Sequence, residues 1–514
     1  MIDATPLLKL YARHRLRVLE RQDPAAAQER TLLHLVRRAR RTRFGKDHGF
    51  AAIRSVGEYQ QRVPLRRYDD FWREYWEPHF PRLTNCTWPG IMPYFADTSG
   101  TSTGVRKHIP VSRAMLSSNA RAVFELFAHH LARHRESRLF AGKSLMLGSS
   151  AGLIEAAPGI HHGDLSSIAV SEVPRWASRF AFPGPRLAAE PDWEKYADRL
   201  ARLSLKEDIR SFGGTPSWML LFVEKLLKLR PGARGIADLY PHLELLVHGG
   251  VDFRPYHKMF DRLLAGSRAE LREVYPASEG FIAVGDRGSG EGLRLLLDNG
   301  LFFEFVPVAE LDSSNPARRW LADVKTGTTY AIVLTSCAGL WSYVLGDTIR
   351  FIDTKPGRLL VTGRTTYFLS AFGEHLSGEH IADAVVEAAA AIDAGITDYT
   401  VGPIFPANPG EQGRHLFIIE FAPPVPEGKR RDLFAEVLDT ALQRASYDYE
   451  QYRSGNARLA APKVHVASPG TFAEWMRKVG KLGGQNKVPR ITTDPERILE
   501  LWRFAGGELA TSVQ

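Results

Sequence analysis

A run of seven Thr, Ser and Gly residues, Thr98–Gly104, is the stretch of the sequence with the clearest potential for chemistry. Such a run has no side chains that could fill a hydrophobic core, and its glycines leave the backbone free to turn. Successive backbone N–H groups in such a loop can surround an anion, and Arg106 and Lys107 follow directly. Because the flanking residues are apolar, we predict a hydroxyl-rich phosphate loop rather than a flexible surface loop.

The common phosphate-binding motifs do not account for this loop. Residues 142–144, Gly-Lys-Ser, have the end of a Walker A sequence, but the place of its first glycine is taken by Ser137. No Gly-x-Gly-x-x-Gly pattern follows a predicted strand. The sequence therefore indicates a different class of nucleotide-using protein.

Strands and helices that alternate along the chain would position these residues. Strands are predicted at 143–147, 210–212, 243–247 and 273–275, and helices at 7–21, 25–41, 112–135, 192–206, 218–229 and 256–264. This alternation is typical of an α/β fold with parallel strands, whose ligands bind beyond the carboxyl ends of the strands. Gly249 and Gly250 follow one strand and residues 277–280 follow another, so both loops could reach one ligand.

A smaller β-rich subdomain is predicted from residue 293, with strands at 293–297, 301–306, 328–335 and 340–344. Asn299-Gly300 predicts a hairpin turn within it. Asp347, which follows a glycine at a strand end, could accept hydrogen bonds from a ribose diol or could equally cap a turn.

The tail of the chain is predicted to be a separate small α+β lobe. We divide the chain into a large N-terminal lobe, 1–357, and a small C-terminal lobe, 358–514. The second lobe has a predicted hairpin built from 359–361, 363–364 and 368–372, strands at 417–421 and 463–467, and helices at 378–391, 429–446 and 471–477. Residues 478–490 form a glycine-rich, basic segment that looks mobile.

Composition limits the class of protein. The 514 residues are 44% hydrophobic and 24% charged, with a net charge of +9 that suits anionic substrates without requiring nucleic acid. Two distant cysteines, and the lack of a signal peptide or an apolar run long enough for a membrane span, predict a reduced cytoplasmic protein. His161-His162-x-Asp164 has metal-ligand residue types, but adjacent histidines point apart, so we expect a surface loop there. No feature of the sequence indicates an oligomeric state.

The chain resembles the Gretchen Hagen 3 family of acyl-acid amido synthetases, within the adenylate-forming, firefly luciferase-like superfamily. The motifs that carry the resemblance are 98–104, Tyr-Pro-Ala-Ser-Glu at 275–279, Ala-Gly-Leu-Trp-Ser-Tyr-Val-Leu-Gly-Asp at 338–347, Phe-Phe-Glu-Phe at 302–305 and Gln-Asn-Lys-Val-Pro-Arg at 485–490. Each motif alone is weak, but five in order over about four hundred residues are strong. Arginine and alanine are enriched evenly along the chain, and in this the chain looks more like a bacterial member of the family.

The resemblance implies a two-step reaction with ATP and Mg²⁺. A carboxylic acid is activated as an acyl-adenylate with release of pyrophosphate, and an amino acid amine then attacks the acyl carbon, while a mobile C-terminal lobe swings between the steps. Bringing a carboxylate to an anionic phosphate needs cations and oriented donors. The resemblance implies that the phosphates are cradled by Ser99, Gly100, Thr101 and Ser102, and that the adenine is lined by Gly249, Gly250 and Tyr275. It also implies that Asp347 binds the ribose and that Glu279, with Ser278 beside it, holds Mg²⁺. Lys487 is implied to stabilise the charge that develops during adenylation.

The chain departs from the family pattern at three positions. Val344 stands where the family motif usually has an arginine, and Ala277 stands where the family motif can have a serine. Thr366 stands at the hinge, where aspartate is common. The first departure could reorganise the ribose side of the site, and the last could alter the pivot.

Two other readings of the chain stay open. An acyl-CoA synthetase or stand-alone adenylating enzyme would share the first half-reaction. A non-catalytic nucleotide- or acid-binding protein would not need Glu279, Asp347 and Lys487. The acyl pocket could include Phe95, Trp218, Phe281 and the 115–127 helix, although such side chains are commonly core.

Overall fold

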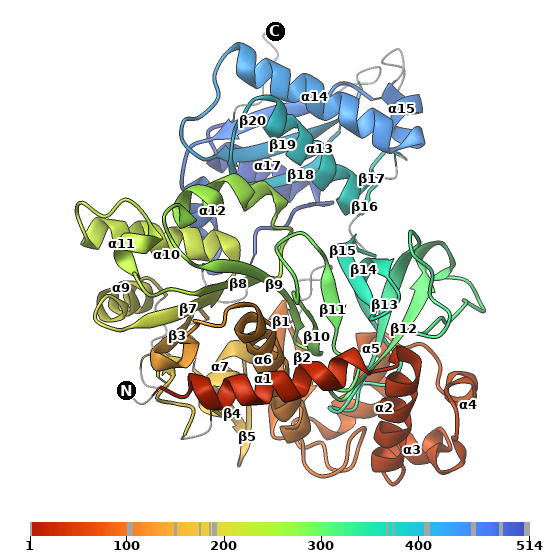
Figure 1. Ribbon diagram of the computed structural model, residues 1–514. Coiled ribbons are helices and arrows are strands. Elements are labelled where there is room, and N and C mark those ends of the chain that lie inside the picture. The colour runs from red at the N-terminus through yellow and green to blue at the C-terminus, as the bar shows by residue number, and fades with distance from the viewer. Residues whose placement is uncertain are drawn as a thin grey trace. The chain divides into compact units, whose positions relative to one another are not determined.

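The chain folds into two compact units in a computed structural model (Figure 1). The structure describes residues 3–99, 106–148, 152–173, 176–184, 187, 193–365, 368–372, 374, 376–405, 412–453, 459–482 and 487–507. The first unit contains the chain up to Val251 and Gly266–Thr362, and the second contains Asp252–Ala265, Gly363–Leu482 and the residues described from 487 onwards. The main segment of the second unit thus begins at Gly363, a few residues after the predicted boundary, and the unit also includes residues 252–265, which the sequence placed in the first lobe.

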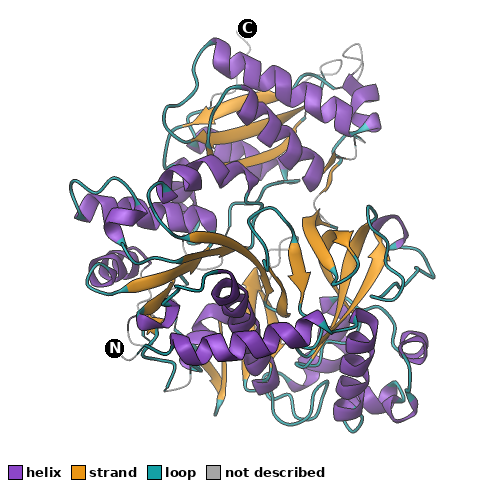
Figure 2. Cartoon of the chain, viewed as in Figure 1, coloured by secondary structure: helices purple, strands orange, loops and turns teal. Residues whose placement is uncertain are grey.

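A mixed sheet of eleven strands organises the first unit, in the order β12-β13-β14-β15-β11-β10-β9-β8-β7-β3-β6. Strands are drawn in orange in Figure 2. Its parallel half contains β6 (Ala181–Phe182), β3 (Lys143–Met146), β7 (Ile209–Gly214), β8 (Leu245–Gly249) and β9 (Glu270–Ala277). The connecting segments contain α9 (Trp193–Ser204), α10 (Pro216–Leu229) and α11 (Ile236–Leu239). Side chains such as Phe212 and Leu246 are fully buried, as expected for parallel strands covered on both faces. The predicted α/β class with parallel strands is confirmed.

The other half of the large sheet is antiparallel. It contains β10 (Gly280–Val284), β11 (Leu293–Leu295), β15 (Arg358–Arg364), β14 (Tyr343–Asp353), β13 (Thr329–Ser336) and β12 (Leu301–Pro307). The predicted β-rich stretch therefore continues the parallel sheet. The hairpin predicted at Asn299-Gly300 is wrong, because β11 pairs with β10 and β15 while β12 pairs with β13.

A four-stranded sheet in the first unit carries the flanks of the Thr/Ser/Gly run. Its order is β2 (Arg106–Val111), β1 (Tyr94–Ser99), β5 (Ile160–Gly163) and β4 (Ile154–Ala157). The surface loop predicted at residues 161–164 is wrong, because β4 and β5 form a hairpin that turns at Gly159, with φ of +72°, and α7 (Leu165–Ser171) follows. The short strands have little alternation from which they could be recognised.

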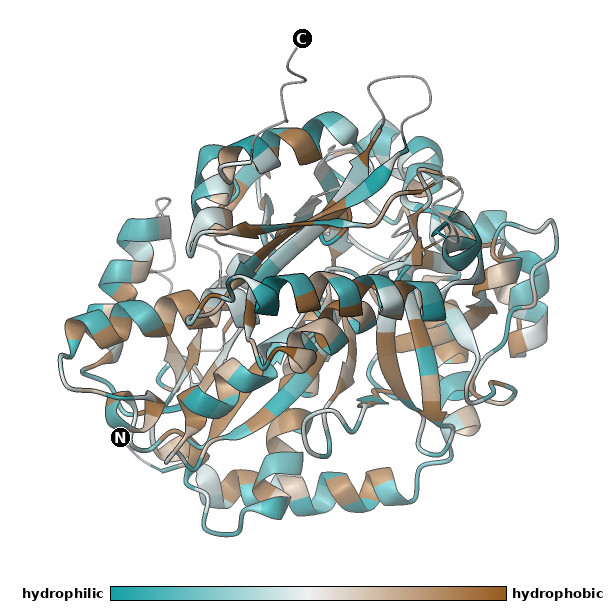
Figure 3. Ribbon diagram, turned by 90° about the horizontal axis from the view of Figure 1, so that it is seen from above, coloured by the Kyte–Doolittle hydropathy of each residue, from teal (hydrophilic) through white to brown (hydrophobic). Residues whose placement is uncertain are grey.

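Helices in the first unit agree with the predicted periodicity. The three longest near the N-terminus are α1 (Thr5–Glu20), α2 (Pro24–Ala39) and α6 (Arg113–Arg133), and three short ones are α3 (Arg43–Asp47), α4 (Val56–Arg62) and α5 (Tyr68–Phe71). Ser112 is the N-cap of α6, since its hydroxyl accepts the backbone N–H of Met115 at 3.1 Å. The helices carry teal and brown bands in Figure 3, as expected when one face lies in the core. Among the described residues, we find no helix whose length and hydrophobicity would suit a membrane span.

The second unit is built on a three-stranded sheet with helices on both faces. The strands are β18 (Ile396–Ile404), β19 (Arg414–Phe421) and β20 (Lys463–Ala467), in that order. Alternate residues of β19 face two cores, one with α13 (Gly378–Ala391), α14 (Lys429–Ala445) and α15 (Tyr447–Arg453), the other with α16 (Thr471–Lys478) and α17 (Pro495–Phe504) (Figure 1). The unit also holds α12 (His257–Leu264), β16 (Phe368–Leu369) and β17 (Leu376–Ser377). Because β16 pairs with β17 and β15 pairs with β11, the hairpin predicted from 359–361, 363–364 and 368–372 is wrong.

Candidate active site

The carboxyl ends of β7, β8 and β9 lie at one edge of the large sheet. The register pairs Gly214 with His248 and Gly249 with Val274. The two-glycine loop after β8 therefore lies beside the end of β9, which carries Tyr275. This is the edge at which open parallel sheets bind ligands.

A hydrogen bond joins Tyr275 to Asp347, two residues that come from different predicted nucleotide motifs. The Tyr275 hydroxyl donates to the Asp347 carboxylate at 2.5 Å, across 72 positions of sequence. Asp347 lies in a bulge of β14: Ala331 pairs with Thr348 and Val333 with Val344, so three residues of β14 stand opposite one of β13. A bulge redirects side chains, and this one directs a half-buried carboxylate towards β9.

The two-glycine loop owes its composition to close packing. A Cβ atom on Gly249 would lie 2.3 Å from the backbone oxygen of Val274. Gly250 has φ of +84°, a conformation that L side chains rarely adopt. The backbone can thus come close to the neighbouring strand and to a flat ligand, which suits the predicted adenine-lining role.

Ser278 and Glu279 form the tip of the turn between β9 and β10. Ala277 pairs with Gly280 across this turn, and Gly280 has φ of +155°. Both tip residues are half-buried. A carboxylate at such a tip is a hard oxygen ligand of the type with which proteins hold Mg²⁺ together with substrate phosphates. The donor chemistry of Glu279 therefore fits the predicted metal.

The Thr/Ser/Gly run joins two paired strands. Ser99 is the last residue of β1 and pairs with Arg106, the first residue of β2. Three predicted phosphate-binding residues, Gly100, Thr101 and Ser102, lie outside the described residues. The Lys107 ammonium lies 5.1 Å from the centre of the Tyr68 ring, a cation–π contact that holds this side chain beside the sheet.

Beside this hairpin, the structure brings together a cluster that the sequence analysis missed. The two oxygens of Asp97 on β1 contact the Nδ1 atoms of His108 on β2 and His162 on β5, each at 2.8 Å. His161 points away, with its ring 6.1 Å from that of Tyr94. Burial alone would raise the pKa of Asp97, but the hydrogen bonds from both histidines hold it below its usual value.

Lys487 belongs to the second unit and is exposed. Three residues later, the Arg490 guanidinium donates to the Asp398 carboxylate, to the Tyr399 carbonyl at 3.0 Å and to the Tyr256 hydroxyl at 2.8 Å. Main-chain bonds fix the same segment to β18, from Val401 N to the Arg490 carbonyl at 3.0 Å and from residue 492 back to the Val401 carbonyl at 2.8 Å. The chain that carries Lys487 is therefore firmly anchored at its C-terminal side.

One departure from the family pattern has a packing explanation. Val344 is buried in an apolar cluster with Val306 and Val333. A valine fills this place at no such cost, whereas burying an arginine here would cost the free energy of removing water from its charged group. Thr366, the departure at the predicted hinge, lies outside the described residues.

Two of the suggested acyl-pocket residues belong to packed clusters. Phe95 is buried against Phe80, with ring centres 5.1 Å apart, and Phe281 packs with Val274 and Leu296. These contacts favour the core alternative for both.

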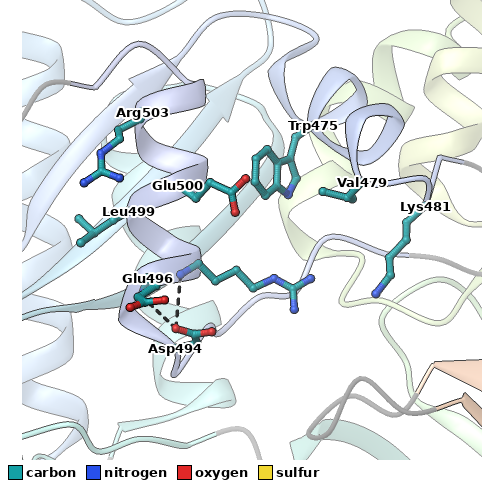
Figure 4. Close-up of a pocket in the computed structure, with 9 residues that line it drawn as sticks. Trp475, Val479, Lys481, Asp494, Glu496, Leu499, Glu500 and Arg503 are labelled. Carbon is teal, nitrogen blue, oxygen red and sulfur yellow. Dashed lines mark hydrogen bonds between the residues drawn. The ribbon is translucent and has the colours of Figure 1, made fainter.

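A separate open pocket of about 690 Å³ lies in the second unit (Figure 4). It is lined by Trp475, Val479, Lys481, Asp494, Glu496, Arg497, Leu499, Glu500 and Arg503. The Asp494 carboxylate accepts the backbone N–H groups of Glu496 and Arg497, which caps α17. Among the residues that the structure describes, no predicted site residue lines this pocket.

Comparisons with known proteins agree with the family resemblance that the motifs indicated. Residues 15–185, 294–364 and 379–496 match the GH3 family N-terminal, central and C-terminal domains, which together cover more than half of the chain. A putative indole-3-acetic acid-amido synthetase from Oryza sativa subsp. japonica is 25% identical over 435 residues, which is 73% of this chain and 86% of the relative.

Solved structures share the fold. The AtGH3.15 acyl acid amido synthetase, in complex with 2,4-DB, has a TM-score of 0.81 at 18% identity and covers 95% of both chains. A 2-hydroxyisobutyryl-CoA ligase in its postadenylation state has a TM-score of 0.60 at 16% identity, over 94% of this chain and 93% of that one. At these identities the likeness concerns the fold.

Proposed function

We propose, from the premise that the chain belongs to the GH3 family and is an ATP-dependent acyl-acid amido synthetase, that it joins a small carboxylic acid to the amine of an amino acid. Relatives named as indole-3-acetic acid-amido and jasmonoyl–L-amino acid synthetases make these two acids the first to test. The acid attacks the α-phosphorus of ATP and pyrophosphate leaves; the amine then attacks the acyl carbon and AMP leaves.

The first half-reaction places an anion beside an anion, so the site must supply positive charge and oriented donors. Ser99 and the residues Gly100, Thr101 and Ser102 would offer N–H and hydroxyl groups to the phosphates. Glu279 would hold Mg²⁺, which when bound neutralises phosphate charge. Lys487 would stabilise charge that develops during adenylation.

The second role of the site is to hold the nucleoside. Gly249, Gly250 and Tyr275 would line the adenine, and Asp347 would accept hydrogen bonds from the ribose hydroxyls. Ser278, beside Glu279 at the tip of the turn, would add a hydroxyl near the phosphates.

One observation supports this reading most strongly: the 2.5 Å hydrogen bond between Tyr275 and Asp347. It brings the second and third motifs together next to the two-glycine loop, at the carboxyl edge of the sheet. A tyrosine that donates to one carboxylate oxygen orients the carboxylate, and the second oxygen is suited to accept from a ribose diol.

For Lys487, the support is its anchored setting. Adenylation needs this ammonium at the phosphates, whereas amide formation needs room for the amine. We therefore propose that the small lobe, predicted as 358–514, changes its position between the two steps. The bonds of Arg490 would keep Lys487 in a defined place on that lobe.

Pyrophosphate release tests the proposal. The full chain is mixed with ATP, Mg²⁺ and one acid at a time, with no acceptor, with pooled amino acids, or with CoA. Faster release with amino acids supports amide formation. Stimulation by CoA alone would favour an acyl-CoA synthetase. This alternative is tested because the fold also resembles that of a CoA ligase. Tight ATP binding without release for any acid would favour a binding protein.

Variants separate the proposed roles. We expect Lys487→Ala to lower adenylation strongly while amide formation from a supplied acyl-adenylate is kept. Glu279→Gln should raise the Mg²⁺ concentration needed for half-maximal rate. Lys481→Ala, at a half-buried lysine of the same lobe, is the control and should leave the rate unchanged. Full activity of Lys487→Ala would remove the role proposed for this lysine.

A further inference from the structure

The cluster of Asp97, His108 and His162 has the composition and spacing of a metal site. One potential ligand atom from each of the three residues lies within 4.8 Å of the others. The residues come from three different strands, and the ladder pairs Asp97 directly with His108 and Phe95 with His162. The backbone therefore fixes all three residues before any ion arrives.

The surroundings of the cluster are sheltered but open to an ion. The side chains of Asp97, His108 and His162 are 12%, 20% and 16% exposed. The His108 ring packs against Phe80 and Trp72, at centre distances of 5.0 and 6.2 Å. These contacts limit ring motion, and limited motion lowers the entropy lost on binding.

The nearest lysine on the same strand does not compete for the cluster. Lys107 precedes His108, and adjacent residues of a strand point to opposite faces. Its ammonium lies over the Tyr68 ring. The cluster thus contains one carboxylate and two imidazoles, and such a set favours Zn²⁺ and neighbouring first-row ions over Mg²⁺.

We propose that Asp97, His108 and His162 bind one first-row transition-metal ion such as Zn²⁺, with water as a further ligand. In the metal-free cluster, each neutral imidazole ring would carry its proton on Nδ1 and donate it to Asp97. When Nδ1 binds the ion, the same ring would carry its proton on Nε2 instead. Each ring therefore stays neutral and loses no proton overall. The site shares no residue with the proposed Mg²⁺ ligand, Glu279. The ion would tie β1, β2 and β5 together two residues before Ser99, near the strand ends that flank the Thr/Ser/Gly run.

A second cluster with similar spacing offers an internal comparison. His130, His134 and Glu270 also have potential ligand atoms within 4.8 Å of one another. Glu270, however, is already paired with Arg272 at 2.9 Å and with Arg133 at 3.4 Å. Two guanidinium groups beside Glu270 oppose a cation at this second cluster.

Titration of the metal-free, untagged full chain with ZnCl₂ alone tests the proposal, with Co²⁺ absorption as a second readout. We expect one equivalent to bind, and His108→Ala and His162→Ala to weaken binding by at least about tenfold. His161→Ala, the neighbour that points away, and His134→Ala should bind like the unchanged chain. Binding that survives both His108→Ala and His162→Ala, or that is lost only in His134→Ala, would overturn the proposal.

Loss of folding could imitate loss of a ligand. His162→Asn keeps an N–H donor for Asp97 but removes the imidazole, and its thermal unfolding should match that of the unchanged chain. If this folded variant binds Zn²⁺ as tightly as the unchanged chain, His162 is no ligand. If the unchanged chain binds no Zn²⁺ or Co²⁺, the cluster is only a hydrogen-bonded brace.

Discussion

Replacing Arg490 with methionine should destabilise the second unit and slow adenylation. Arg490 is 19% exposed and its partner Asp398 11% exposed, so the ion pair is largely shielded from water. The Arg490→Met change keeps most of the aliphatic bulk but leaves the Asp398 carboxylate without its cation. It also removes the donor to the Tyr256 hydroxyl and the contact of the guanidinium with the Tyr399 ring, 4.3 Å away.

The size of the effect follows from these contacts. Removing one partner of a buried pair costs about 3–5 kcal/mol, and the partial exposure of Arg490 places the loss near the lower end, at about 3 kcal/mol. For a unit of this size, about 1 kcal/mol shifts the melting temperature by about 2–4 °C, so we expect a fall of about 6–12 °C. Burial already raises the pKa of Asp398, and without Arg490 it would rise further.

Calorimetry and ATP–pyrophosphate exchange are the assays. The double variant Arg490→Met/Asp398→Asn removes the orphaned charge and should recover more than half of the lost stability. Exchange should stay slowed by about tenfold, which is about 1.4 kcal/mol, because the chain that carries Lys487 has still lost its anchor. A single variant that loses less than about 1 kcal/mol, or a double variant with normal exchange, would refute the reasoning.

Three further predictions concern the first unit. Asp347→Asn should raise the KM for ATP by about ten- to hundredfold, since hydrogen bonds to a charged group contribute about 1.5–3 kcal/mol; an unchanged KM would contradict the ribose role. Gly249→Ala should lower stability and ATP affinity together, because its Cβ would lie 2.3 Å from a backbone oxygen of the next strand; urea unfolding and nucleotide titration measure both. Burial would raise the pKa of Glu270, but hydrogen bonds from His130 and Arg272 lower it from 4.5 to about 2. This carboxylate therefore adds stability above about pH 4.5 that is lost as the pH falls towards 2, and the difference between the unchanged chain and Glu270→Gln should shrink over that range.

Local sequence signals predicted those helices and strands whose own residues carry the pattern that forms them. The helix predicted at 378–391 is observed with those bounds, because Ser377 caps it and its apolar face repeats with helical period. The parallel strands were recognisable from short buried apolar runs before glycine-rich turns. Their order in the sheet was not, since it depends on pairings between distant segments.

Asn299-Gly300 shows how distant pairing overrides a local signal. Gly300 does adopt a positive φ, +78°, as a hairpin turn would require. The Asn299 amide, however, donates to the backbone oxygen of Ser118 at 2.8 Å, and its oxygen accepts from Arg121 at 3.0 Å. The turn therefore joins the chain to α6 instead of closing a hairpin.

Residue types and motif spacing led to a candidate site, but its geometry could not be predicted from the sequence. Motif spacing pointed to Tyr275 and Asp347, but the bulge that brings the carboxylate to the tyrosine has no sequence signal. Arg490 was part of a motif, yet its partners Tyr256 and Asp398 lie 234 and 92 positions away. Asp97, His108 and His162 likewise meet only because three strands lie side by side.

The most direct test of the central claim is to identify the product. The full chain, ATP, Mg²⁺, indole-3-acetic or jasmonic acid and an equimolar amino acid mixture would be incubated, and AMP and any amide quantified by mass spectrometry. We predict an acyl–amino acid amide formed in a one-to-one ratio with AMP, and none with Lys487→Ala. AMP without amide across an extended acid panel, or a thioester as the sole product when CoA is present, would contradict the assignment.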